Sequence, residues 1–209
     1  SAMLSDAIID PDPVRLTAVE QGWISLTGTG PMLTATQRHA IIGAARAAWE
    51  GADAPDVALG PAGEAAYWMA IDAGGVTSAV VGDLEARGLD RFSYLEIVGI
   101  VARLSNIDFY ATGLGGSRPS LPDPDPAAPT GDVAAGAILA DMWVPQVGPV
   151  RAPMVLDALP GEGNAFRAIH EPMYIPFHEI GNGAYADVLT RPQLEYVAAR
   201  ASYLNECFY

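Results

Sequence analysis

The chain has 209 residues, of which half are hydrophobic and 17% are charged, and its formal net charge is −14. This charge repels nucleic-acid phosphates and anionic lipid surfaces, so composition argues against nucleic-acid and membrane partners. A single cysteine excludes an intrachain disulfide framework and a multi-cysteine zinc site, and we expect no bound metal. No leader-like segment and no apolar run of membrane-spanning length stand out, so we expect a cytoplasmic protein.

Helical periodicity dominates the first half of the chain. Thr34 is a plausible N-cap, and apolar residues recur at helical spacing after it. The stretch 92–112 is apolar nearly all round, which is typical of a helix buried on every side. The predicted helices of this half are 14–27, 35–50, 62–73, 77–87 and 92–112.

The second half is less regular. Residues 113–129 are rich in Pro, Gly, Asp and Ser, which is typical of a linker, and three prolines predict an irregular path over 141–159. Short helices are expected at 164–174 and 176–181, and a last helix from Arg191 to the chain end. Few stretches alternate as a strand requires, so the sequence predicts an all-α fold.

Two segments 156 residues apart resemble each other. Residues 33–51 read LTATQRHAIIGAARAAWEG and residues 189–207 read LTRPQLEYVAARASYLNEC, with five of 19 positions identical. The apolar phase also agrees, which favours an internal duplication over two unrelated amphipathic helices. The copies differ where His39 corresponds to Glu195 and Gly51 to Cys207, so only the second can hold a thiol site.

Cys207 and Glu195 are the candidate catalytic residues. A thiol reacts as its thiolate, and a glutamate twelve residues earlier could accept the thiol proton if the chain turns between them. The alternatives are a buried, inert cysteine and a solvated glutamate.

Three histidines could also carry chemistry. His170 and His178 are eight residues apart, with Pro172 and Pro176 between them, so they do not share one helical face. We interpret them as interface or capping residues rather than as metal ligands.

The last segment, LTRPQLEYVAARASYLNECFY, resembles the signature of the alkylhydroperoxidase D-like, or carboxymuconolactone decarboxylase, superfamily, and in particular its peroxidase-related branch. Glu195 matches the signature glutamate, Cys207 the first cysteine of a Cys-x-x-Cys pair, and Phe208-Tyr209 the residues between the cysteines. Residues 92–115 are similar to the long closing helix of the same fold. The resemblance implies a complete cysteine-free repeat over 4–116, a linker over 117–140 and the opening part of a second repeat over 141–209.

This resemblance implies an oligomerising helical peroxidase that uses no cofactor and takes a hydroperoxide and a thiol reductant as partners. Its first thiol becomes a sulfenic acid, a second thiol resolves it, and a glutamate and a histidine relay protons. The second thiol would be residue 210, so we expect no dithiol cycle in this chain. One hypothesis is that codon 210 encodes selenocysteine, which makes the protein a selenoprotein candidate.

Three functions stay open at the level of sequence. The first is a thiol-dependent peroxidase, an antioxidant oxidoreductase that is inactive in this form. The second is a non-catalytic helical scaffold that pairs with another chain. We expect a dimer that covers the apolar face of the second repeat, for example by exchange of the last helix between chains. The third is a carboxymuconolactone decarboxylase-like lyase, for which His39, His170 and Glu171 are the candidate residues.

Overall fold

The computed structural model describes residues 3–140, 143–149 and 154–205. Within these ranges it contains seven α-helices, four 3-10 helices and no β-sheet, which confirms the all-α prediction. The α-helices are α1 Pro13–Thr27, α2 Ala35–Trp49, α3 Gly60–Ile71, α4 Ser78–Ala86, α5 Arg91–Gly113, α6 Pro160–Met173 and α7 Arg191–Leu204. The 3-10 helices are η1 Val57–Leu59, η2 Ala73–Gly75, η3 Met154–Ala158 and η4 Phe177–Glu179.

Side-chain caps fix the starts of most of these helices. The side chains of Asp12, Thr34, Thr77 and Asp90 accept backbone N–H groups at the first turns of α1, α2, α4 and α5. The helix predicted over 176–181 is wrong, because only the short turn η4 forms there. One turn between Pro176 and Gly181 is too short to offset the cost of helix nucleation.

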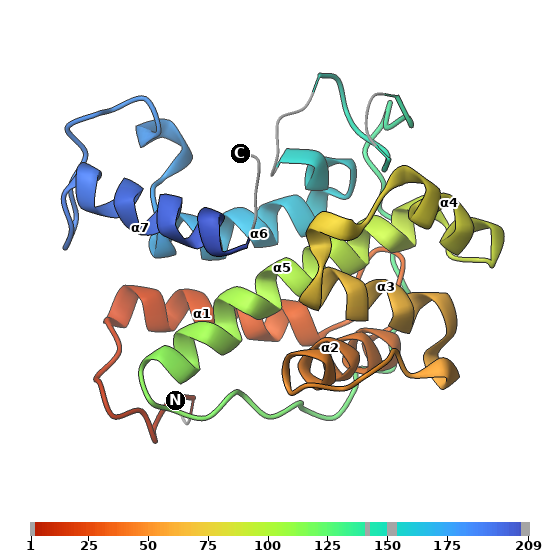
Figure 1. The fold of residues 1–209 in the computed structure, drawn as a ribbon, viewed down its shortest axis with the longest axis horizontal. Coiled ribbons are helices and arrows are strands. Elements are labelled where there is room, and N and C mark those ends of the chain that lie inside the picture. Colours follow the sequence, from red (N-terminus) through yellow and green to blue (C-terminus); the bar gives the residue numbers. More distant parts are fainter. Residues whose placement is uncertain (1–2, 141–142, 150–153, 206–209) are drawn as a thin grey trace.

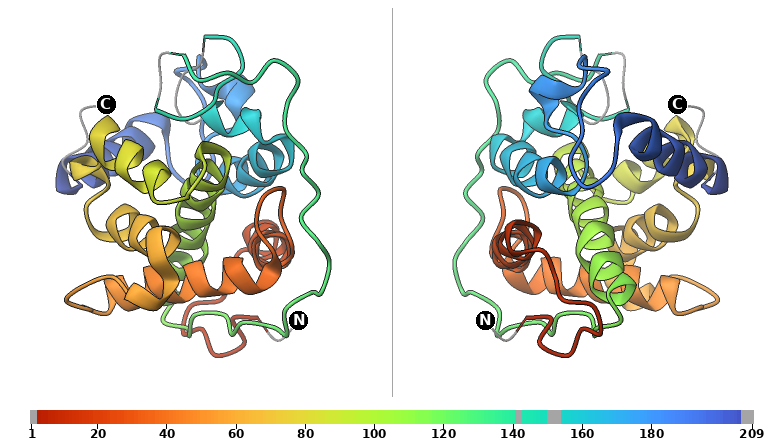
Figure 2. Two further views of the ribbon diagram at one scale, coloured as in Figure 1. Left: turned by 90° about the vertical axis from the view of Figure 1, so that its right-hand side faces the viewer. Right: turned by 90° about the vertical axis from the view of Figure 1, so that its left-hand side faces the viewer.

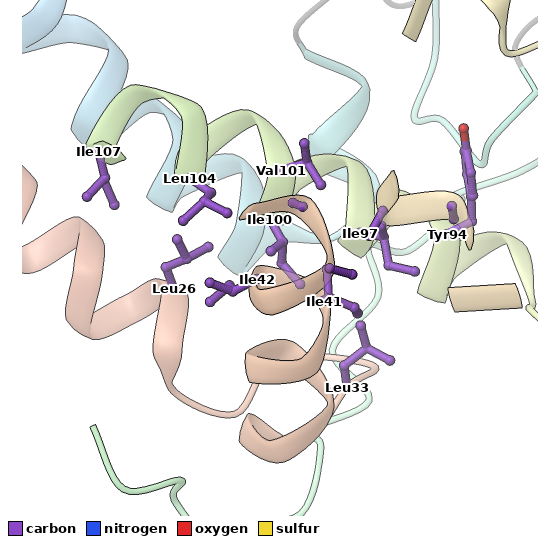
Figure 3. Close-up of a cluster of buried hydrophobic side chains, with 14 of the residues drawn as sticks. Leu26, Leu33, Ile41, Ile42, Tyr94, Ile97, Ile100, Val101, Leu104 and Ile107 are labelled. Carbon is purple, nitrogen blue, oxygen red and sulfur yellow. The ribbon is translucent and has the colours of Figure 1, made fainter. Parts of the chain in front are cut away.

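Helix α5 runs through the centre of the molecule, with α1, α2, α3 and α6 packed around it (Figure 1). Its residues Ile100, Leu104 and Ile107 meet Leu26 of α1 and Ile42 of α2 in the apolar core (Figure 3). Each aliphatic side chain buried here contributes roughly 1.5–3 kcal/mol. The core therefore fixes α1, α2 and α5 relative to one another.

The prediction that α5 is apolar nearly all round requires a correction. Glu96, Arg103 and Asp108 are all fully buried on this helix. A buried charge is tolerated only where another charge and hydrogen bonds compensate it. Each of these residues has an oppositely charged partner on another helix.

Helix α6 packs into the same core, although residues 114–159 separate it from α5. Ile169 of α6 belongs to the central apolar cluster. A Cβ atom added to Gly22 of α1 would lie 3.0 Å from the Ile169 side chain, so the two helices approach closely. The division into 4–116 and 141–209 stays a prediction, and the described parts of the two segments share one core.

Residues 114–140, which follow α5, lie along the body of the molecule (Figure 2). Ser117 donates its backbone N–H to Asp6, and Thr130 donates to the Gly30 carbonyl oxygen. The Ala134 N–H donates to Ala158, at the far end of the segment. This predicted linker is therefore a strap with defined attachment points.

Helix α7 lies at the periphery and contains no buried residue (Figures 1 and 2). It begins with the same capping box as α2, in which Thr190 and Gln193 take the places of Thr34 and Gln37. The two similar segments therefore start helices in the same way, but only α2 is packed into the core. No helix of the described residues is long and apolar enough to cross a bilayer.

Candidate functional site

Glu195 projects from the second turn of α7, and two other side chains hold its carboxylate. The Arg191 Nε donates to one carboxylate oxygen at 2.6 Å, and the Tyr174 hydroxyl donates to the other at 3.3 Å. The Glu195 side chain is 48% exposed, so a solvent-borne molecule can reach it. Glu195 is a fixed carboxylate at the surface rather than a freely moving one.

Arg191 also ties α7 to the preceding loop. Its terminal guanidinium nitrogens donate to the carbonyl oxygens of Ile180 at 2.9 Å and Asn182 at 3.2 Å. Because Arg191 stands one turn before Glu195, these bonds set the orientation of the Arg191–Glu195 pair. Arg191 was not among the predicted site residues, although its position four residues before Glu195 on a helix predicts a contact between the two side chains.

Tyr174, just past the end of α6, is the second residue that the sequence reasoning missed. Burial, together with the negative charge and hydrogen bond of Glu195, raises the pKa of the Tyr174 hydroxyl. The hydroxyl therefore keeps its proton and remains a donor at neutral pH. Nothing in the sequence indicates that Tyr174 and Glu195 meet, since 21 residues separate them.

Cys207 lies outside the described residues. Helix α7 ends at Leu204, and Asn205 is the last residue whose position is described. The pairing of Glu195 with Cys207 therefore stays a prediction.

The candidate histidines have separate surroundings. His39 Nε2 lies 2.8 Å from the Thr27 carbonyl oxygen, which makes His39 a link between α1 and α2. His170 stacks on Phe166 at 5.3 Å between ring centroids, and burial lowers its pKa, opposed by Glu171. His178 is mostly exposed. Among the contacts of the described residues, none joins His39 to His170.

A cluster of four buried charges lies deeper, between α2, α5 and α6. The Arg38 Nη1 contacts Glu96 at 2.6 Å and Glu162 at 3.0 Å, and Arg103 makes a close ion pair with Glu162. All four side chains are at most 5% exposed. We call Arg38, Glu96, Arg103 and Glu162 the charge quartet.

Backbone groups complete the quartet. The N–H groups of Met32 and Leu33 donate to one Glu96 oxygen at 2.7 and 3.1 Å. Arg38 donates to the Leu26 carbonyl oxygen at 3.0 Å. Burial raises the pKa of Glu96 to about 7, against the lowering effect of Arg38 and with a further increase from the charge of Glu162.

Gly30 shows how tightly the quartet is enclosed. A Cβ atom at this position would overlap both the Arg38 guanidinium and the Glu96 carboxylate. The two arginines and two glutamates sealed in this way offset one another's charge when both glutamates are ionised. This arrangement fits a structural role better than a catalytic one.

Comparison with known proteins identified no relative of this chain. No family model, no curated protein and no solved structure matches the chain. Within the part of the chain that the structure describes, no group of three His, Cys, Asp or Glu side chains could hold a metal ion.

Proposed function

We propose that this chain is a thiol-dependent hydroperoxide-reducing oxidoreductase of the alkylhydroperoxidase D-like type, inactive in a dithiol cycle and dependent on an external thiol because it has one cysteine, with Cys207 as nucleophile and Glu195 as its proton acceptor. The observation that supports it is the fixed, half-exposed carboxylate of Glu195, on the helix that leads toward Cys207. The Tyr174 hydroxyl and the anchored Arg191 hold this carboxylate in one orientation.

In the proposed reaction, Glu195 takes the proton of the Cys207 thiol. The thiolate sulfur attacks the terminal oxygen of the hydroperoxide, the O–O bond breaks, and Cys207 becomes a sulfenic acid. The alkoxide that leaves takes the proton back from Glu195 and departs as the alcohol. Two molecules of an external thiol then reduce the sulfenic acid, which releases water and a disulfide and restores Cys207.

The test is the intact mass of the protein after treatment with cumene hydroperoxide and a sulfenic-acid trap. Because Cys207 is the only cysteine, every trapped adduct reports on it. We expect an adduct on the unaltered chain and none on Cys207→Ser. A chain that forms no adduct would overturn the proposal.

Substitution of Glu195 tests whether the rate of adduct formation depends on proton transfer or only on the exposure of the thiol. Glu195→Gln should slow adduct formation by on the order of 100-fold near neutral pH, because proton transfer contributes effects of that size. Tyr196→Phe changes the adjacent exposed position and should leave the rate unchanged. Equal rates for both variants would remove Glu195 from the mechanism.

A non-catalytic role in oligomerisation is the second candidate, and the outer face of α7 favours it. Tyr196, Val197, Tyr203 and Leu204 are 59–76% exposed. They recur seven residues apart, so they form one stripe along the helix. Sedimentation over a wide concentration range should show a dimer that Val197→Lys with Leu204→Lys dissociates. A monomer throughout would contradict this role.

A further inference from the structure

A surface groove on α3 is lined by aromatic, acidic and aliphatic side chains, and neither proposed function involves it. Trp68 is 37% exposed and stands between two hollows of about 430 and 350 Å³. Both hollows are lined by Trp68 and Glu64. We call the two hollows and the ring between them the Trp68 groove.

Helical spacing aligns the groove along α3. Glu64 and Trp68 are four residues apart on one face of α3, and Asp72 follows four residues later as the C-cap, just past the end of the helix. With a rise of 1.5 Å per residue, Glu64 and Asp72 are separated by about 12 Å along the axis. The Trp68 ring makes an edge-to-face contact with the Tyr67 ring, at 5.1 Å between ring centroids.

The electrostatics of the groove favour a cationic ligand. Asp56 lines the first hollow, Asp72 the second, and Glu64 both. Arg87 is the one cationic side chain lining these hollows, and it is held by Glu64 at 2.7 Å and Asp83 at 2.8 Å. Among the described residues, Glu64 is therefore paired with Arg87, whereas Asp56 and Asp72 accept only the backbone N–H groups of Ala58 and Gly75 and keep their charge. The net charge of −14 reinforces the negative field.

The walls of the groove are apolar between the carboxylates. Pro55 and Val57 line the first hollow, and Val76 and Val80 line the second. Val57 is 93% exposed, which leaves an aliphatic surface open to a ligand. An ammonium group over the Trp68 ring gains a cation–π interaction, and methylene groups can contact the valines.

We propose that the Trp68 groove binds a linear aliphatic polyamine, with ammonium groups near Glu64 and Asp72 and the methylene chain across Trp68. The alternation of carboxylates with apolar walls matches the alternation of charge and methylene groups in such a ligand. An extended triamine such as spermidine is about as long as the roughly 12 Å between the two helical positions. Peptide backbone finds no exposed strand edge to pair with in the described residues, which favours a polyamine over an extended basic peptide.

The test is a calorimetric titration of the full chain with spermidine at low salt. We expect saturable binding that weakens as salt rises, weaker binding of butylamine, and none of an uncharged diol of the same length. Equal binding of spermidine and butylamine would overturn the proposal. Tighter binding of pentalysine than of spermidine would also overturn it and assign the groove to a basic peptide.

Variants at Trp68 separate the aromatic contact from general charge attraction. Trp68→Leu should weaken spermidine binding by about 2- to 30-fold, whereas Trp68→Phe keeps an aromatic face and should retain most of the affinity. Asp72→Asn should also weaken binding, because an ammonium group is placed near Asp72, and Asp123→Asn, an exposed carboxylate on the strap, should not. Unchanged affinity in Trp68→Leu would refute the placement of the ligand.

Discussion

At the scale of single residues, the charge quartet decides how the later part of the chain is attached. Glu162 contacts both Arg38 and Arg103, and it is the only member of the quartet on α6. Without it, two buried arginines would face one glutamate. Loss of the Glu162 charge would therefore leave an uncompensated buried positive charge, which lowers the stability of the fold.

We predict that Glu162→Gln lowers the free energy of unfolding by about 3–5 kcal/mol, the usual cost of breaking a buried ion pair on one side. Glu171→Gln, on the same helix but only half-buried, should change it by less than about 0.5 kcal/mol. Urea denaturation of both variants measures the difference. A similar effect of the two substitutions would mean that the quartet adds no stability.

Glu96 predicts a dependence of stability on pH. Its pKa is about 7 in the folded protein and 4.5 ordinarily, so the folded chain binds this proton more tightly than the unfolded chain. The stability that this group contributes is therefore complete below about pH 4.5 and is lost as the pH rises through 7. Unfolding curves should show a lower free energy of unfolding at pH 8 than at pH 5.5, and Glu96→Gln should abolish this difference. The same loss in the variant would assign it to other groups.

The residues of the quartet were only partly predictable. Glu96 and Arg103 lie seven residues apart in an otherwise apolar segment, which indicates two charges on one face of a buried helix. Their partner Glu162 comes from a helix about sixty residues away, and only the packing of α6 brings it there. The same holds for Tyr174 beside Glu195, whereas Arg191 could be read from its helical spacing.

At the scale of elements, local signals succeeded where caps and periodicity agree. The predicted starts and ends of α1 to α5 lie within two residues of those observed, because Asp, Thr and Pro mark the starts and Gly follows several ends. Helix α6 begins four residues earlier than predicted, at a proline in its first turn. Pro160 is a local start signal that the prediction did not use, and packing against α1 and α5 stabilises these first residues.

The two capping boxes give a prediction that separates the similar helices. Thr34→Ala should lower global stability by about 1 kcal/mol, because α2 is part of the core. Thr190→Ala should leave global unfolding unchanged and speed hydrogen exchange within α7 alone, since no residue of α7 is buried. Hydrogen exchange and urea denaturation distinguish these outcomes. Global destabilisation by Thr190→Ala would show that α7 is coupled to the core.

At the scale of the whole molecule, the sequence predicts the fold class and the non-helical segment after α5 but not the path of that segment. A stretch rich in Pro, Gly and Asp is expected to be a flexible linker. The structure instead attaches it, through partners far away in sequence such as Asp6 and Gly30. The composition of a single sequence predicts that such a segment is not helical. It does not predict the surface along which the segment runs.

The start of the strap is held by Asp108 of α5, which predicts how it can be released. Arg46 donates two hydrogen bonds of 2.8 Å to Asp108 and a third of 3.0 Å to the Pro119 carbonyl oxygen. Asp108→Asn removes the charge that orients Arg46, so the Pro119 contact should loosen. We expect faster hydrogen exchange at Gly116 and Ser117 in this variant, while Thr130 and Gly131 stay protected by their own bonds to the loop after α1. Faster exchange at both ends together would mean that the strap detaches as one unit, and the stability of the molecule would then depend on the whole segment rather than on separate attachment points.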